Sequence, residues 1–174
     1  MTEAAIVLRA ATTADLDAID EIELHSFTRP WPKKTFEAEL RREWARLDVA
    51  LVAGRIVAFC DYWIVAPPRA QRGEQEKENL AAGEMQILAI ATHPDFRGHG
   101  VGAAILDHVL AQAAAAGCQI ASLEVRAGNR PAIALYEHAG FKTVHVRARY
   151  YADDDEDALV MTRGLSVIEP SPRP

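Results

Sequence analysis

The stretch Arg97-Gly98-His99-Gly100-Val101-Gly102 separates a run typical of a β-strand, Glu84 to Ala91, from a long helical run, Val101 to Ala116. The first N–H groups of a helix have no partners inside the helix, and the helix dipole adds partial positive charge at that end. Glycines let an anion approach the backbone, and Arg97 can add a charged contact. The segment therefore predicts a strand–turn–helix unit that binds a pyrophosphate.

The glycine motif by itself leaves three interpretations open. It can be a tight turn without a ligand, or the pyrophosphate site of a coenzyme. It can also be a dinucleotide site, because Gly98, Gly100 and Ala103 match a relaxed Rossmann fingerprint. A Walker A loop is excluded, because no Gly-Lys-Ser/Thr follows the glycines.

The rest of the chain has strand and helix patterns on both sides of this unit. Strands are predicted at residues 5–9, 49–52, 56–65, 84–91, 119–125, 141–146 and 158–162. Helices are predicted from Leu16, along the apolar stripe Phe36, Leu40, Trp44 and Leu47, over 101–116, and from an N-cap at Asn129 to Gly140. This order predicts a mixed α/β (α+β) sheet with helices on both faces.

The chain length favours a single domain, because two domains in 174 residues would each have a thin core. We expect this domain to span residues 1–165 and to be followed by a disordered tail at 166–174. Residues 66–83 have few apolar side chains and predict a long solvated loop inside the domain. The loop can be a mobile insertion or a flap over a substrate groove.

Composition excludes several classes of function. A formal net charge of −6 argues against a nucleic-acid partner, which requires a basic face. Cys60 and Cys118 lie in strand-like runs, which predicts reduced core thiols in a cytoplasmic protein. We expect no metal, since no cysteine pair or H-E-x-x-H motif offers ligands. We expect no membrane segment, because no apolar run reaches about 18 residues.

The segment Leu123 to Phe141 reads L-E-V-R-A-G-N-R-P-A-I-A-L-Y-E-H-A-G-F. It resembles the signature of the RimI-type ribosomal-protein-alanine N-acetyltransferases, a branch of the GNAT acetyltransferases, and matches every fixed position of that signature. Pro30-Trp31 and the Tyr150-Tyr151 pair are also similar to the branch. The resemblance implies a single, mostly antiparallel GNAT sheet and an enzyme that uses acetyl-CoA. The loop at 66–83 is longer than the branch leads us to expect.

The same resemblance assigns the residues that bind acetyl-CoA. The glycine run fits the family's R/Q-x-x-G-x-G/A pattern, so the pyrophosphate contacts are expected at Arg97, Gly98, His99, Gly100, Val101, Gly102 and Ala103. The family pairs the pantetheine arm with the backbone of the preceding strand, here Ile90, Ala91 and Thr92. It also places a coenzyme A contact at Asn129.

The resemblance implies a general base at Glu124 and a general acid at Tyr136. Strand alternation points Glu124 away from the face of Leu123 and Val125. A phenol is protonated at neutral pH and can donate to a departing thiolate. An α-amino group with a pKa near ~7.8 costs only about 1 kcal/mol to deprotonate at pH 7, whereas a lysine costs about 4.6 kcal/mol. A carboxylate base is therefore adequate for a protein N-terminus.

The resemblance also implies that Trp31, Tyr150 and Tyr151 form the walls of a peptide groove, although aromatic loop residues can instead plug a core. The acidic run Asp153 to Glu156 predicts a solvated loop or a surface that attracts a basic substrate. The expected acceptor is the N-terminal alanine of a small-subunit ribosomal protein. Other N-termini, lysines and small amines remain open, as does a non-catalytic acyl-CoA-binding module.

Overall fold

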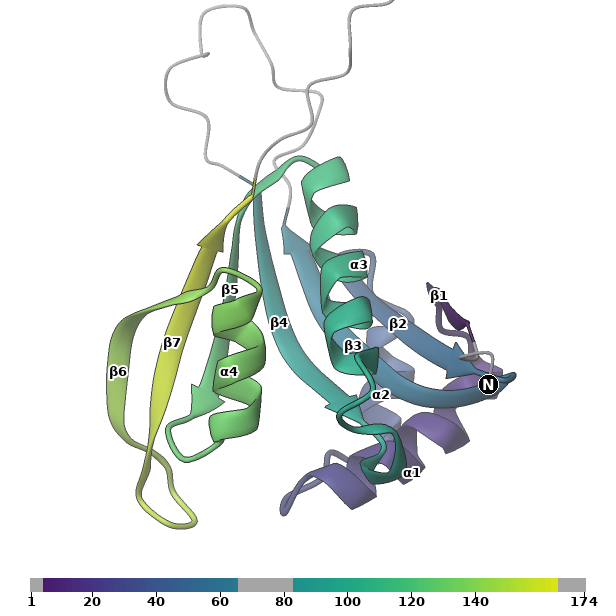
Figure 1. Ribbon diagram of the computed structural model, residues 1–174, viewed down its shortest axis with the longest axis horizontal. Coiled ribbons are helices and arrows are strands. Elements are labelled where there is room, and N and C mark those ends of the chain that lie inside the picture. Colours follow the sequence, from purple (N-terminus) through teal and green to yellow (C-terminus); the bar gives the residue numbers. More distant parts are fainter. Residues whose placement is uncertain (1–4, 66–82, 166–174) are drawn as a thin grey trace, which may run out of the picture.

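The computed structural model describes residues 5–65 and 83–165 of the chain (Figure 1). The predicted tail at 166–174 lies outside the described residues, and so does the predicted loop at 66–83 apart from Gly83. Between these limits, the element order is the one that the sequence predicts: β-α-α-β-β-β-α-β-α-β-β.

A single seven-stranded sheet forms the centre of the molecule. Its strands, in the spatial order β1-β2-β3-β4-β5-β7-β6, are β1 Ile6–Ala10, β2 Ala45–Val52, β3 Arg55–Val65, β4 Gly83–Thr92, β5 Cys118–Arg126, β7 Glu156–Gly164 and β6 Lys142–Tyr151. Only β4 and β5 pair in parallel, and every other neighbouring pair is antiparallel. The predicted mixed, mostly antiparallel sheet is confirmed.

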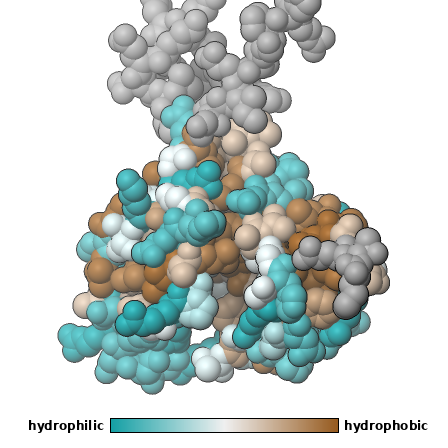
Figure 2. Space-filling model, in the orientation of Figure 1, coloured by the Kyte–Doolittle hydropathy of each residue, from teal (hydrophilic) through white to brown (hydrophobic). Residues whose placement is uncertain are grey.

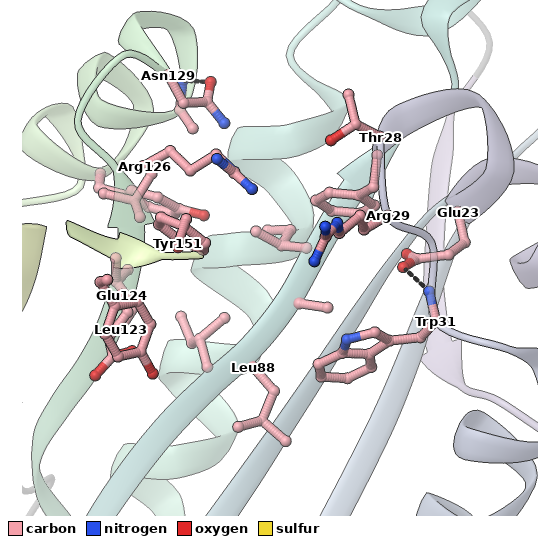
Figure 3. A pocket seen from close by; sticks show the side chains of 18 of the residues that line it. Glu23, Thr28, Arg29, Trp31, Leu88, Leu123, Glu124, Arg126, Asn129 and Tyr151 are labelled. Atoms are coloured by element: carbon pink, nitrogen blue, oxygen red, sulfur yellow. Dashed lines mark hydrogen bonds between the residues drawn. The ribbon is translucent and has the colours of Figure 1, made fainter. Parts of the chain in front are cut away.

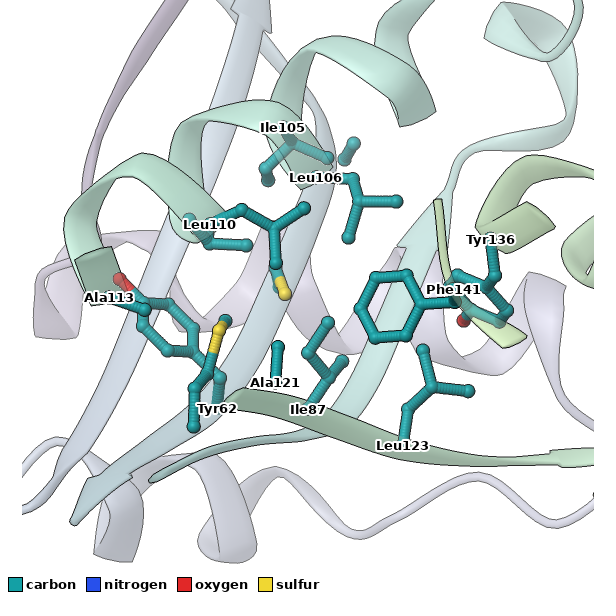
Figure 4. Close-up of a cluster of buried hydrophobic side chains, with 14 of the residues drawn as sticks. Tyr62, Ile87, Ile105, Leu106, Leu110, Ala113, Ala121, Leu123, Tyr136 and Phe141 are labelled. Atoms are coloured by element: carbon teal, nitrogen blue, oxygen red, sulfur yellow. The ribbon is translucent and has the colours of Figure 1, made fainter. Parts of the chain in front are cut away.

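Helices cover both faces of this sheet. The first two, α1 Leu16–Ser26 and α2 Lys33–Glu39, pack on one face, and α3 Val101–Ala115 and α4 Arg130–His138 pack on the other. Two separate apolar clusters divide the faces. Along β3, Ala58, Cys60 and Tyr62 belong to the α3/α4 cluster, whereas Phe59 between them belongs to the α1/α2 cluster. Figure 4 shows the α3/α4 cluster, in which α3 side chains point onto the sheet beside Tyr136 and Phe141.

Local signals set the helix ends. The Asp15 carboxylate accepts from the Thr12 N–H at 2.7 Å, just before α1 begins. Asn129 Oδ1 accepts from the Ala132 N–H at 3.3 Å and caps α4. Gly117 follows α3 with φ +92°, a conformation that side chains with a Cβ rarely adopt. These three boundaries agree with the sequence prediction.

The predicted second helix is too long. It was expected to carry Phe36, Leu40, Trp44 and Leu47 on one stripe, but α2 ends at Glu39 and β2 begins at Ala45. Phe36 is buried beneath α2, whereas Trp44 is half exposed and Leu47 is buried from the strand. The alternation in residues 45–49 matches a strand, and pairing of β2 with both β1 and β3 outweighs the helical spacing.

The last two strands are longer than predicted. The strand expected at 141–146 is β6, Lys142–Tyr151, and the one expected at 158–162 is β7, Glu156–Gly164. Tyr150 and Tyr151 therefore end a strand instead of lying in a connection. Phe141 precedes β6 and is buried against Tyr136.

The central strands β4 and β5 separate part-way along their length. Their pairing runs from Gly83↔Cys118 to Ile87↔Leu123 and then stops. At that point Leu88 is an extra residue in β4, because Ile87 and Ala89 pair with consecutive residues of β3. Such a bulge bends and twists its strand. Beyond it, β4 follows β3 while β5 follows β7, so the sheet opens into a V (Figure 1).

Candidate active site

A cavity of about 550 Å³ lies between the diverging ends of β4 and β5. Figure 2 shows the α3/α4 face as two lobes with apolar side chains, separated by a depression with a polar lower rim. The cavity walls come from five parts of the fold: α1 with the segment after it, β4, β5, α4 with its N-cap, and the end of β6 with the turn after it. The opening of the sheet thus brings together residues more than 120 positions apart in the chain, from Glu23 to Asp153.

Glu124 enters this cavity from the α1/α2 face. Its neighbours Leu123 and Val125 are buried in the α3/α4 cluster, so strand alternation sends Glu124 to the other side, as predicted. Its carboxylate pairs with the Arg147 guanidinium at 3.1 Å. Interaction with this carboxylate also raises the pKa of Tyr150. Glu124 is therefore a partly exposed carboxylate beside a cation and a phenol.

Tyr136 reaches the same cavity from the α3/α4 face. It is only 6% exposed, lies in α4 and packs edge-on against Phe141, with the ring centroids 6.0 Å apart. Burial raises the pKa of its phenol well above the usual value, so the hydroxyl keeps its proton at neutral pH. The predicted acid and base thus approach one cavity from opposite faces of the sheet.

The glycine run forms the turn before α3. Gly98 and Gly100 both have φ +76°, and nothing lies within 4 Å of the position of an added Cβ at either residue. Gly100 is the N-cap of α3, so the N–H groups that follow have no partners inside the helix, and no side chain caps them. Arg97 folds back over the turn, donating to the Thr92 carbonyl at 3.0 Å and to Ser26 Oγ at 3.1 Å.

The predicted coenzyme contacts divide between two places. Ile90 and Asn129 line the main cavity, together with the Tyr136 side chain. Ala91, Thr92 and residues 97–103 are not among its lining residues; they continue from the end of β4 into α3. Gly102 lies close to both β4 and α4, because an added Cβ there would be 3.4 Å from Thr92 Oγ1 and 3.6 Å from Leu135. The glycine turn is therefore next to two of the elements that line the cavity.

All three predicted groove aromatics line the cavity. Trp31 is 36% exposed and packs near Phe36, with ring centroids 6.0 Å apart. Tyr150 and Tyr151 meet edge-on at 5.3 Å on the opposite side. Trp31 is thus not simply a plug of the core, since a third of it remains accessible beside the cavity.

The acidic run forms an exposed turn, as the solvated-loop interpretation predicts, but three of its four carboxylates are paired with one cation. Arg126 pairs with Asp153 at 2.8 Å, Asp154 at 3.0 Å and Glu156 at 2.9 Å. The same guanidinium lies 3.9 Å from the centre of the Tyr151 ring. The hydrogen bond to Glu156 and its acidic neighbours raise the pKa of Arg126 further above its usual range. Arg126 therefore fixes the end of β6 and the connection to β7 onto β5.

Arg126 and Glu23 are among the cavity residues that were given no role from the sequence. Arg126 was part of the quoted signature, but its partners lie about 30 positions away and no local pattern names them. Glu23 is only 2% exposed and lies on α1, four residues after Ile19 and seven after Leu16. A glutamate on the apolar stripe of a helix was the signal that could have identified it.

Residues 16–141 match the family model described as "Acetyltransferase (GNAT) family". The chain belongs to the GNAT acetyltransferase family. A ribosomal protein bS18-alanine N-acetyltransferase of Salmonella typhimurium is 32% identical over 90% of this chain and 95% of its own length. The crystal structure of the ribosomal-protein-S18-alanine N-acetyltransferase from Escherichia coli superposes with a TM-score of 0.78 at 29% identity, covering 97% of this chain and 99% of that one.

A further structural neighbour is Arabidopsis thaliana NAA60 in complex with acetyl-CoA, with a TM-score of 0.78, 19% identity, and coverage of 92% of this chain and 99% of that one. At this identity the likeness concerns the fold. As a member of the GNAT family, the chain is an acetyltransferase that uses acetyl-CoA. Its own structure fits that substrate, because the open glycine turn leaves room for a pyrophosphate at the start of α3.

Three further observations concern the residues that the structure describes. Residues 5–65 and 83–165 contain no group of three or more His, Cys, Asp or Glu side chains placed to hold a metal ion. None of the helices in these ranges is long and apolar enough to cross a membrane. Cys60 and Cys118 are buried free thiols, as predicted.

Proposed function

We propose that this protein transfers the acetyl group of acetyl-CoA to the N-terminal α-amino group of a protein, with Glu124 as base and Tyr136 as acid. One observation carries the proposal: the two side chains enter the gap between β4 and β5 from opposite faces of the sheet. A thioester lying in this gap has a carboxylate on one side and a phenol on the other.

Because the two faces of the sheet carry different groups, we place the two substrates on opposite sides of it. The glycine turn and α4 lie on the α3/α4 side, so acetyl-CoA enters there with its pyrophosphate at the start of α3. Past Ile87, the edge of β4 that faces β5 has no strand partner, and its backbone at Ile90 to Thr92 can pair with the pantetheine amides. Asn129 contacts the coenzyme from the start of α4.

The acceptor then approaches from the α1/α2 side, between Trp31 and the Tyr150–Tyr151 pair. Glu124 takes a proton from the attacking amine, directly or through water, and Tyr136 donates its proton to the departing thiolate. Burial suits Tyr136 to this step, because it keeps the phenol protonated until the thiolate forms. Arg147 pairs with the Glu124 carboxylate at 3.1 Å and so orients the proposed base.

The acceptor we favour is the N-terminal alanine of a small-subunit ribosomal protein. The relatives from Salmonella typhimurium and Escherichia coli, named for this reaction on bS18, support it through their coverage of nearly the whole chain. The RimI-type signature from Leu123 to Phe141, which includes both proposed catalytic residues, supports it as well.

A thiol-release assay with three acceptors tests this function. The acceptors are an Ala-starting peptide, an acetyl-blocked peptide with one lysine, and a polyamine. We expect turnover with the first and little with the others. Preference for the lysine peptide or the polyamine would replace N-terminal acetylation with another GNAT activity. Tight acetyl-CoA binding without turnover on any of them would indicate a binding module.

A further inference from the structure

Glu23 has a carboxylate oxygen with no partner among the described residues. Its Oε1 accepts from the Trp31 backbone N–H at 2.9 Å, whereas its Oε2 is buried and makes no hydrogen bond there. Leaving a buried carboxylate oxygen unpaired is costly, and native structures seldom do so without a reason. Glu23 also lines the main cavity, so a ligand bound there is placed to supply the donor that Oε2 lacks.

The position of Glu23 places it opposite Glu124. Figure 3 shows the two carboxylates on opposite sides of the cavity, one from α1 and one from β5, with Trp31 below Glu23. Both lie on the α1/α2 side of the sheet, where the proposed function brings the acceptor. A group held between them would have one carboxylate on each side.

We propose that Glu23 is the residue that binds the acceptor's α-amino group, through its free Oε2. This inference rests on the proposed function and adds the residue that recognises the substrate's amine. An ammonium or amine N–H donates to Oε2, while Trp31, held by Oε1 of the same carboxylate, flanks the first residue. One side chain thus links recognition of the amine with placement of the aromatic wall.

The surroundings of Glu23 favour a cation in this part of the cavity. Asp61, in β3 on the same face, is fully buried, and neither of its oxygens has a partner among the described residues. Glu39 beside it accepts from Trp63 Nε1 at 2.8 Å and from Arg42 at 2.5 Å. Burial and the neighbouring Asp20 raise the pKa of Glu23. An ammonium ion bound beside this carboxylate favours its ionised form and offsets the cost of burying the charge.

A binding experiment isolates this contact from catalysis. The two probes are an Ala-starting hexapeptide and the same peptide with a propionyl group in place of the alanine, which lacks only the amine. Affinities are measured by calorimetry on the full chain in the presence of coenzyme A. We expect the wild type to bind the amine peptide about tenfold or more tightly, as for a charge-assisted hydrogen bond.

Glu23→Gln should bring this affinity ratio close to one, because the amide still accepts from Trp31 but carries no charge. Glu23→Asp should keep part of the ratio. The control Glu37→Gln alters an exposed α2 carboxylate paired with Arg41 and should keep the full ratio. A wild-type ratio near one, or an unchanged ratio in Glu23→Gln, overturns the inference. Absence of acetyl transfer by the wild type would instead overturn the proposed function, and the binding ratio remains measurable in that case.

Discussion

The two faces of the sheet bring different kinds of groups to the candidate active site. The α3/α4 face offers mostly backbone: a glycine turn, the N–H groups at the start of α3, and the free edge of β4. The α1/α2 face carries acidic side chains: Glu23 lines the cavity wall, and Asp61 and Glu39 are buried between the helices and the sheet. Backbone recognition needs only a short local motif, whereas side-chain recognition depends on segments that meet only after folding.

Substituting the proposed acid and base, one from each face, tests this division most directly, and here we expect the largest effects. Glu124→Gln and Tyr136→Phe should each lower kcat by about 10²- to 10⁴-fold, the usual contribution of a positioned acid or base. The affinity for acetyl-CoA should stay within about twofold, because neither substitution touches the glycine turn. Steady-state kinetics and calorimetry provide the two readouts. Wild-type turnover in both variants would remove the proposed mechanism.

The buried Asp61 carboxyl on the α1/α2 face should lower the free energy of unfolding as the pH rises. Burial raises the pKa of Asp61 to about 8, against an ordinary value of 3.8. Between these values the folded protein holds a proton that the unfolded chain releases, so the stabilising contribution is lost as the pH rises towards 8. Asp61→Asn should remove this dependence, about 1.4 kcal/mol per pH unit between pH 5 and 8.

Urea unfolding at pH 5, 6, 7 and 8 gives the slope of the free energy of unfolding against pH for the wild type and for Asp61→Asn. Asp107→Asn is a matched control on the other face, because Asp107 is exposed on α3. It should leave the pH dependence as in the wild type. Parallel curves for the wild type and Asp61→Asn would show that this face carries no such cost.

The backbone character of the α3/α4 face can be tested at Gly100. Gly100→Val forces a β-branched residue to φ +76° and should weaken acetyl-CoA binding about tenfold, given the cost of a left-handed conformation. Gly54→Val imposes similar strain at φ +78° in the β2–β3 turn. This control should lower the melting temperature but leave acetyl-CoA affinity unchanged. Equal affinities in both variants would argue against the glycine turn as the pyrophosphate site.

The smallest expected effect concerns Arg126 at the edge of the acceptor groove. Arg126→Gln releases three carboxylates and the Tyr151 ring, so the KM for the peptide should rise about fivefold, in line with the modest value of exposed ion pairs. The KM for acetyl-CoA should not change. Arg41→Gln breaks an exposed pair on α2 and serves as control. A change in the KM for acetyl-CoA alone would place Arg126 on the coenzyme side.

The accuracy of the sequence predictions follows this division between the faces. Helix boundaries such as Asn129 and Gly117, and the strand alternation around Glu124, depend on neighbours in sequence and were predicted correctly. The prediction of a helix through Trp44 and Leu47 was wrong because these residues fit both helical spacing and strand alternation. Pairing with a distant strand decided in favour of the strand. The contacts of Arg126 and the burial of Glu23 were missed because both depend on segments that meet only after folding.

By itself, the sequence determined the element order, the helix caps, the glycine turn and the family. Each is encoded in short stretches, in which backbone geometry and side-chain alternation act over a few residues. Tertiary structure decided where β4 and β5 separate, because that point depends on the Leu88 bulge and on pairing with β3 and β7. It also decided that Glu23 is buried at the cavity wall with one oxygen unpaired among the described residues, since burial arises only once α1 packs on the sheet.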